Sequence, residues 1–338
     1  MKLVNIHDVA KLAKVSIATV SRVTSNKEGV NEETKARVIE AMAKLGYRPN
    51  SAARTLRMSK SNIVIVLMIN IKNSFFSEFI RGIEEVARKA GYYILIGSTD
   101  GDPEKEAEYI DLVQESRVDG VILTTAGVLD ETTIKKISET SPMVLTFDYV
   151  PSNQIPSISI DNESASRKIT NHLIGLGHTR IAHITGDMGR LQTQTRLYGY
   201  KQALSQHSIP VDEALIQEGG YLFKDGYLAT KKILSFDNLP TAIYGGNDNV
   251  AIGSIKAIIE AGLRIPEDIA VVGFDDVDIS NYVSPSLTTI HQPRYEIGKR
   301  AMGLLLKKIS QEKVDHRHII LEDELIIRES CGHNLLIK

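Results

Sequence analysis

The chain has 338 residues, 42% hydrophobic and 24% charged, with a formal net charge of −2. This composition excludes collagen-like, coiled-coil and disordered classes, and the length indicates about two domains at roughly 150 residues each. The single cysteine, Cys331, has no internal disulfide partner, which favours a reducing compartment. The longest nearly unbroken apolar run, Ile63 to Ile69, is far shorter than the roughly 20 residues of a membrane span. The first eight residues turn polar too early for a signal peptide, so we expect a cytoplasmic protein with no membrane association.

Charge is divided unevenly along the chain. Residues 1–60 contain 12 Lys/Arg and 5 Asp/Glu, a net charge of +7, whereas the other 278 residues contain 28 and 37, a net charge of −9. A basic head on an acidic body is typical of a nucleic-acid-binding module joined to another domain. A solvated helical bundle that is merely basic would show the same balance, so charge alone leaves both interpretations open.

Three short helices are predicted within residues 1–46. Asn5, Ser16 and Asn31 are residues of the type that caps helix N-termini, and Gly46 suits the end of the third helix. Two helices joined by a tight turn and supported by a third predict a helix-turn-helix domain. The residues expected to face its core are Ile6, Val9, Ala10, Ala13, Val20, Val23, Val38, Ile39, Met42 and Leu45.

Residues 47–61 predict a joint. Tyr47 to Asn50 contains a proline and ends the bundle, and Ser51 to Leu56 has helical composition but is too short to hold a helix alone. We therefore expect a segment whose order depends on its surroundings.

From Ile63 onward, short apolar runs alternate with amphipathic helical patterns. The alternation restarts after Asp161, which predicts two successive doubly wound parallel sheets and hence two similar lobes. Ligands of such sheets bind at the carboxyl ends of the strands, which here means the cleft between the lobes. The predicted strands are 63–69, 92–96, 121–123, 144–147, 180–184, 241–244 and 269–274, and the main predicted helices are 76–90, 164–176, 195–206, 225–235 and 249–261.

Sequence motifs of enzymes are missing. We find no phosphate-binding loop of the G-x-x-x-x-G-K-[ST] type, no G-x-G-x-x-G after a strand, no G-x-S-x-G and no H-E-x-x-H. The histidine pairs 178/183 and 316/318 lack further ligands nearby, so we predict neither a metal site nor a cofactor. Asp275 and Asp276 are adjacent at a strand end and point apart, which predicts one ligand contact and one surface or capping group rather than a proton-sharing pair.

Residues Asp8 to Val23, DVAKLAKVSIATVSRV, resemble the DNA-binding head of the lactose/galactose repressor family. Further matches extend the resemblance over essentially the whole chain: GYRPN at 46–50, RLYGY at 196–200, ND at 247–248, VGFD at 272–275 and LTTI at 287–290. Within the family, segments 75–84, 292–298 and 324–328 look most like the cytidine-repressor branch.

The resemblance implies a fold and a domain division. It implies an all-α helix-turn-helix domain (1–46), a hinge helix and linker (47–61) and a two-lobed α/β core like that of periplasmic binding proteins (62–338). The N-terminal lobe is expected to comprise about 62–161 and 291–321, and the C-terminal lobe about 162–290 and 322–338.

The resemblance also implies a DNA interface. The second helix is expected in the major groove, with Ile17, Ala18 and Arg22 against base edges and Ser16, Thr19 and Ser21 on phosphates. For Ile17, packing in the domain core is the alternative.

The hinge is expected to add minor-groove contacts. Two hinge helices of a homodimer would pair there, with Leu56 as a wedge between base steps, on a pseudo-palindromic operator. The alternative for Leu56 is packing on the core domain. The hinge residues expected to contact DNA are Asn50, Ala53, Arg54, Leu56 and Arg57.

A small-molecule effector site is expected between the lobes. Asp, Asn and Arg side chains bond vicinal hydroxyls and aromatic rings cover apolar ring surface, so the set suits a sugar, a ribose or a nucleoside. Sugar-binding relatives often carry Arg after the aspartate at 148, and here Tyr149 leaves room for a nucleoside. The expected contacts are Phe75, Phe76, Asp148, Arg190, Arg196, Tyr221, Asn247, Asp275 and Gln292.

Three other interpretations compete with an effector-responsive repressor. A catabolite-control regulator would answer to a phosphorylated carrier protein, docked for example near Lys307, but such a regulator has no need of Arg196. A sugar-binding transport protein shares the two-lobed fold, but the Asp8–Val23 motif and the polar N-terminus argue against it. An enzyme carrying an added DNA-binding head lacks any nucleophile–base set or cofactor loop.

Overall fold

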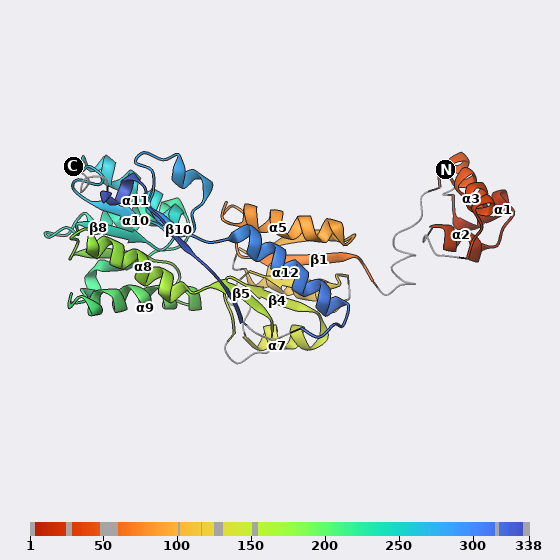
Figure 1. The fold of residues 1–338 in the computed structure, drawn as a ribbon, viewed down its shortest axis with the longest axis horizontal. Coiled ribbons are helices and arrows are strands. Elements are labelled where there is room, and N and C mark those ends of the chain that lie inside the picture. Colours follow the sequence, from red (N-terminus) through yellow and green to blue (C-terminus); the bar gives the residue numbers. More distant parts are fainter. Residues whose placement is uncertain are drawn as a thin grey trace. The chain divides into compact units, whose positions relative to one another are not determined.

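The computed structural model divides into two compact units, Met1–Ser61 and Asn62–Lys338 (Figure 1). It describes residues 4–24, 29–47, 60–100, 102–115, 117–124, 131–150, 155–314 and 318–333. The hinge residues Asn50 to Arg57, including every DNA contact expected there, lie outside the described residues.

The first unit is a helix-turn-helix domain of α1 (Ile6–Ala13), α2 (Ile17–Thr24) and α3 (Glu32–Leu45). The expected caps are present. The side chain of Asn5 accepts hydrogen bonds from the N–H groups of His7 and Asp8, and Asn31 accepts one from Thr34. Lys14 ends α1 in the left-handed conformation, at φ 53°, which makes the tight turn into α2.

The prediction that Ile39 faces the core of this domain is wrong. Val38 and Ala41 of α3 are buried and Met42 and Leu45 are half-buried, but Ile39 is 53% exposed. Residues 38, 41, 42 and 45 form the i, i+3, i+4, i+7 stripe that faces α1 and α2. Because each helical residue turns the direction of the side chain by about 100°, Ile39 points away from that stripe.

The N-terminal lobe of the second unit is built on a six-stranded parallel sheet of order β11-β5-β4-β3-β1-β2. Helices α5 and α12 cover one face, and α6 and α7 cover the other. The strands are β1 (Ile63–Met68), β2 (Tyr93–Ser98), β3 (Gly120–Leu123), β4 (Met143–Thr146), β5 (Ser157–Ile160) and β11 (His318–Leu321). The helices are α5 (Phe76–Lys89), α6 (Pro103–Gln114), α7 (Glu131–Thr140) and α12 (Arg294–Ile309).

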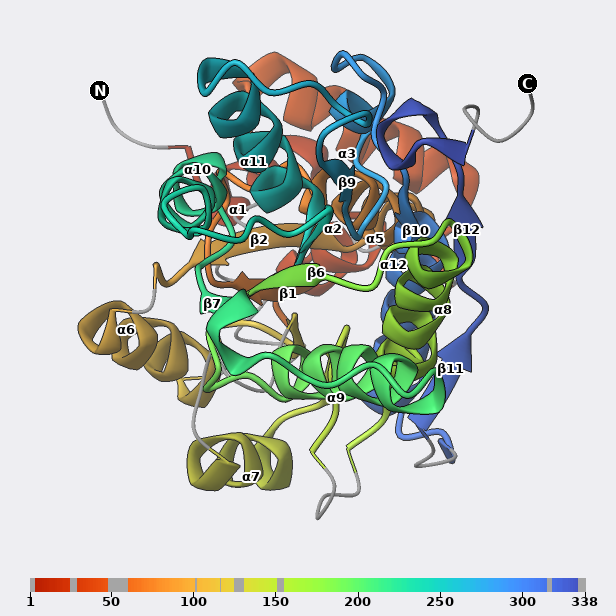
Figure 2. The ribbon, with the colours of Figure 1, turned by 90° about the vertical axis from the view of Figure 1, so that its left-hand side faces the viewer.

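The C-terminal lobe repeats this plan around a four-stranded parallel sheet of order β7-β6-β8-β9. Helices α8 and α9 cover one face and α10 and α11 the other (Figure 2). The strands are β6 (Ile181–Thr185), β7 (Ile216–Glu218), β8 (Ala242–Gly245) and β9 (Ala270–Val272). The helices are α8 (Asn162–Gly175), α9 (Leu191–Gln206), α10 (Phe223–Ile233) and α11 (Asp248–Glu260), with short 3₁₀ turns η1 (Glu213–Leu215), η2 (Asp278–Asn281) and η3 (Glu329–Cys331).

Three crossover segments join the lobes. The chain passes from β5 to α8, returns from β10 (Thr289–His291) to α12, and passes again from β11 to β12 (Glu324–Ile326). Strands β10 and β12 form a small antiparallel pair. The second and third crossovers therefore lie side by side, and the late helix α12 packs against α5 in the N-terminal lobe (Figure 1).

The contact between α5 and α12 requires glycine on both helices. A Cβ at Gly82 would lie 2.1 Å from the carbonyl oxygen of Tyr295, and a Cβ at Gly298 would lie 2.2 Å from that of Phe79. Glycine is the residue that lets two helix backbones approach this closely.

We predict that Gly82→Ala destabilises the core, because the added methyl group must push two backbones apart, at a cost of about 1–3 kcal/mol. Gly303→Ala on α12 is the matched control: nothing lies within 4 Å of its Cβ position, so the same change should stabilise the helix by about 0.5–1 kcal/mol. Urea unfolding of both variants measures the two signs, and equal effects would contradict the packing argument.

Candidate functional site

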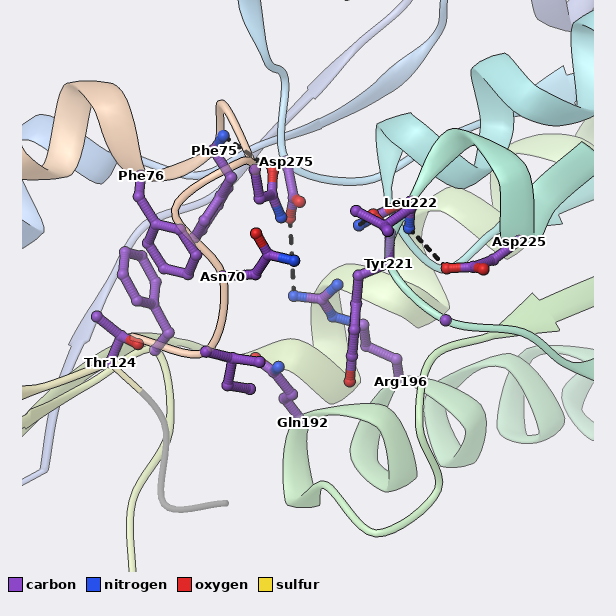
Figure 3. Close-up of a pocket in the computed structure, with 15 residues that line it drawn as sticks. Asn70, Phe75, Phe76, Thr124, Gln192, Arg196, Tyr221, Leu222, Asp225 and Asp275 are labelled. Atoms are coloured by element: carbon purple, nitrogen blue, oxygen red, sulfur yellow. Dashed lines mark hydrogen bonds and ion pairs between the residues drawn. The ribbon is translucent and has the colours of Figure 1, made fainter. Parts of the chain in front are cut away.

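A cavity of about 270 Å³ opens between the lobes at the carboxyl ends of the strands. Figure 3 shows phenylalanine side chains on one side of it and Arg196 and Tyr221 on the other. The cavity is lined by Ile69, Asn70, Asn73, Phe75, Phe76, Thr124, Phe147, Gln192, Arg196, Gly220, Tyr221, Leu222, Asp225, Asn247 and Asp275.

The wall from the N-terminal lobe is aromatic. The Phe75 ring centroid lies 5.2 Å from that of Phe76 and 4.7 Å from that of Phe147. Phe147 follows β4 with a left-handed backbone, at φ 65°, a conformation that costs a bulky residue energy and is held here by packing in the core. The hydroxyl oxygen of Thr124, beyond β3, is buried and forms no hydrogen bond with a described residue. This wall offers apolar ring faces, with the amide side chains of Asn70 and Asn73 beside them.

Arg196 dominates the wall from the C-terminal lobe. Its Nε donates to Oδ1 of Asn162 at 2.8 Å and its Nη1 donates to the carbonyl oxygen of Gly246 at 2.8 Å. The guanidinium stacks over the Phe274 ring at 3.7 Å from the centroid, which leaves Nη2 3.9 Å from Oδ1 of Asp275. Arg196 is buried and therefore held in one orientation before any ligand arrives.

The two adjacent acids have separate roles in the structure. Asp275 lines the cavity and accepts a hydrogen bond from Nε2 of Gln292 at 2.7 Å. Burial raises the pKa of Asp275 to about 6, and the charge of Arg196 acts against that shift. Asp276 points elsewhere, with its carboxylate 2.7 Å from Arg328 and 2.9 Å from His291.

Asn247 and Tyr221 complete the polar edge. Oδ1 of Asn247 caps α11 by accepting from the N–H of Val250, and its Nδ2 donates to the carbonyl oxygen of Tyr221 at 3.1 Å. The hydroxyl of Tyr221 is hydrogen-bonded to Thr193 at 3.0 Å. Both side chains line the cavity from fixed positions.

Of the expected effector contacts, Asp148, Arg190 and Gln292 do not line the cavity. Gln292 is directed to Asp275, and Arg190 lies 3.2 Å from Asp187. Asp148 is buried, and burial raises its pKa to about 6, with the Tyr149 N–H and the charges of Arg196 and Arg190 acting against the shift.

Sequence reasoning missed several lining residues. Asn70, Thr124 and Phe147 each follow a strand of the N-terminal lobe, so the carboxyl-end rule would have selected them. Gln192 and Asp225, in the first turns of α9 and α10, gave no comparable signal in the sequence.

The expected base-contacting residues lie on the outer face of α2. Ile17, Ala18 and Arg22 are exposed, and the 39% exposure of Ile17 excludes its alternative as a core residue of the domain. Ser16 caps α2 by accepting from the Thr19 N–H at 3.1 Å, and the hydroxyls of the two residues are 2.9 Å apart. Ser21 and Thr19 are half-buried.

Asp248 beside the cavity predicts a pH dependence. It is fully buried, accepts hydrogen bonds from Val277, Ser280 and Thr289, and burial raises its pKa to about 7. An aspartate in an unfolded chain has a pKa of about 3.9. Between about pH 4 and 7 the folded chain therefore holds a proton that the unfolded chain has released. The contribution of this group to the free energy of unfolding is lost as pH rises through that window.

We predict that the unfolding free energy of the native chain minus that of Asp248→Asn decreases as pH rises from about 5 to about 8. The difference is the test because His183, whose pKa burial lowers to about 4, contributes a slope of the opposite sign in both proteins. Urea unfolding across this range measures it. A difference that stays constant with pH would show that Asp248 does not titrate as expected.

Comparison with known proteins agrees with this architecture. Residues 5–50 match the family model "Bacterial regulatory proteins, lacI family", and residues 170–331 match "Periplasmic binding protein-like domain". The part of the chain that the structure describes contains no helix long and apolar enough to cross a membrane.

Individual relatives are similar over nearly the full length. Catabolite control protein A of Priestia megaterium is 37% identical over 97% of this chain and 99% of its own, and the HTH-type transcriptional repressor CytR of Escherichia coli (strain K12) is 37% identical over 96% and 95%. The Lac repressor dimer bound to operator and the anti-inducer ONPF is 29% identical with a TM-score of 0.87, covering 98% of this chain and 99% of that one. The chain therefore belongs to the LacI family of bacterial regulatory proteins, which are DNA-binding transcriptional repressors with an effector-binding core.

Proposed function

We propose that this chain is a homodimeric repressor whose affinity for a pseudo-palindromic operator is set by a nucleoside, or another ribose-type sugar, in the cavity between the lobes. The observation that carries the proposal is a cavity of about 270 Å³ with phenylalanine side chains on one wall and Arg196, Asp275 and Asn247 held in place on the other. We propose no enzymatic activity, and we place the protein in the cytoplasm, where its DNA would be.

The polar edge suits hydroxyl groups. A carboxylate accepts and a guanidinium donates, so Asp275 and Arg196 together match two neighbouring hydroxyls, while Phe75 and Phe76 cover the apolar face of a ring. Asp225 and Asp275 outnumber Arg196 among the charged lining residues, which disfavours a phosphorylated ligand.

Tyr149 supports a nucleoside over a plain pentose. This position, where sugar-binding relatives often carry Arg, holds a ring whose centroid is 4.4 Å from that of His318. Tyr149 does not line the cavity, so it supplies no donor for a further hydroxyl. Tyr221, which does line it, offers an aromatic face on which a base can stack.

A second candidate regulator is a phosphorylated carrier protein. Similarity to catabolite control protein A is as high as similarity to CytR, and Lys307 is exposed on α12. Arg196, buried and aimed at the cavity rather than at the surface, favours the small molecule.

Exposed apolar residues support the homodimer. They lie on or directly beside α10, α11 and η2. Helix α11 packs against α10 in the core of this lobe, and its first residue, Asp248, accepts a hydrogen bond from Ser280 of η2. Apolar patches of this kind mark protein–protein interfaces. The residues are Leu222, Phe223, Leu228, Ile259, Ile279 and Tyr282, with Tyr93 and Leu95 on the edge strand β2 of the other lobe.

For DNA, we propose that α2 enters the major groove. Arg22 is exposed there and forks onto a guanine, Ile17 and Ala18 contact thymine methyls, and the hydroxyls of Ser16, Thr19 and Ser21 meet phosphates. We propose the domain division 1–46, 47–61 and 62–338, with the hinge contributing minor-groove contacts from residues 50–57.

We predict that cytidine, adenosine or ribose raises the melting temperature of the core, because a ligand of the folded state alone stabilises it. The same ligand should change operator affinity at fixed salt, with a coupling of about 1–3 kcal/mol. Calorimetry and operator titration measure both effects, with the phosphorylated carrier protein as a further arm. If only the carrier protein changed operator affinity, the small-molecule proposal would be wrong.

We predict that Arg22→Ala weakens operator binding by about 1–3 kcal/mol and relaxes discrimination at one base position. Arg37→Ala is the matched control, since Arg37 is also exposed in the head but lies on α3. Both variants lose one positive charge, so the comparison separates base readout from a general loss of attraction to DNA. Binding to operators with single base changes measures the effect, and equal loss of specificity in both variants would contradict the assignment of α2.

A further inference from the structure

Arg294 connects both walls of the cavity. It is the first residue of α12, directly after the second crossover, and is 5% exposed. Its Nη1 donates to the carbonyl oxygen of Phe75 at 3.2 Å, and its Nη2 donates to the carbonyl oxygen of Asp276 at 2.8 Å. Phe75 belongs to the N-terminal wall, and Asp276 follows Asp275 of the C-terminal wall. One buried cation is therefore hydrogen-bonded to the backbone of both lobes.

The turn that Arg294 holds has a strained backbone. Asp275 and Asp276 have φ values of 115° and 53°, in a region that residues other than glycine rarely adopt. Such strain persists only where the surroundings hold it. The Asp276 side chain is held by Arg328 and His291, and its carbonyl by Arg294. The position of Asp275 at the cavity thus depends on these partners.

Rotation of one lobe against the other would break this bridge. The two carbonyl oxygens belong to different lobes, so a change in lobe angle separates at least one of them from the guanidinium. A buried cation that loses a hydrogen-bond partner is costly. The guanidinium also lies 5.6 Å from the centroid of the Phe75 ring, so its loss would remove a neighbour of that ring as well as of the turn.

We propose that Arg294 is a positioning residue that sets the angle between the lobes and thereby the effector affinity of the cavity. Arg294 does not line the cavity and acts through Phe75 and Asp276. The inference about affinity rests on the proposed function, whereas the inference about lobe angle stands without it.

The lobe angle is tested without any ligand. Spin labels at Glu84→Cys on α5 and Ser205→Cys on α9, both exposed and outside the proposed dimer interface, report the distance between the lobes. Labelled chains are diluted into unlabelled ones to remove signals between protomers. The native Cys331 is buried, so the labelling reagent should not reach it. Arg294→Met should broaden the distance distribution. Arg300→Met is the matched control, because Arg300 lies on the same helix, is half exposed and pairs with Glu296. A distribution in Arg294→Met equal to that of the native chain would overturn the proposal.

The effector affinity is tested by calorimetry with cytidine, adenosine and ribose. Arg294→Met should weaken binding by about tenfold, and Arg300→Met should not. Arg294→Lys should recover little of the affinity, because one ammonium group cannot reproduce the two N–H groups that meet two carbonyls. Full recovery would mean that only the positive charge beside Asp275 matters. If the native chain binds none of the three compounds, the proposed function fails and the spin-label distances still decide the inference. If it binds one that Arg294→Met binds equally well, the inference about affinity fails.

Discussion

The burial of charged side chains along the seam between the lobes is the constraint on which the cavity depends. A charge removed from water needs hydrogen-bond partners close by. Arg196 finds Asn162 at the start of α8, and Asp275 finds Gln292 just before α12. Both partners lie on crossover segments. The groups that face a ligand are therefore held by the same segments about which the lobes would turn.

Each lobe is stiff by construction. In the C-terminal lobe, as between α5 and α12, glycine lets helix backbones touch: a Cβ at Gly226 would lie 2.0 Å from the carbonyl oxygen of Val250, and a Cβ at Gly253 would lie 2.0 Å from that of Phe223. Helices packed this closely cannot slide without steric overlap. Movement within the core is thus confined to the crossovers, where polar contacts rather than close-packed backbones set the geometry.

Local signals in the sequence predicted the local structure well. The caps at Asn5 and Asn31 and the alternation of strands and helices depend on residues a few positions apart, and the structure contains them. The prediction for Ile39 is wrong because the apolar residues of α3 can be grouped into more than one stripe, and the sequence does not decide which stripe is buried. No local pattern predicts the pairing of β10 with β12, which joins segments about 35 residues apart and depends on the packing of both lobes.

The cavity shows the same limit, since strand ends can be predicted but side-chain partners cannot. The rule that ligands meet the carboxyl ends of strands selected Phe75, Asn247 and Asp275, all of which line the cavity. Gln292 was expected there too, but it donates to Asp275 instead. That choice depends on the distance and angle between two side chains that are 17 positions apart in the sequence, which no local pattern contains.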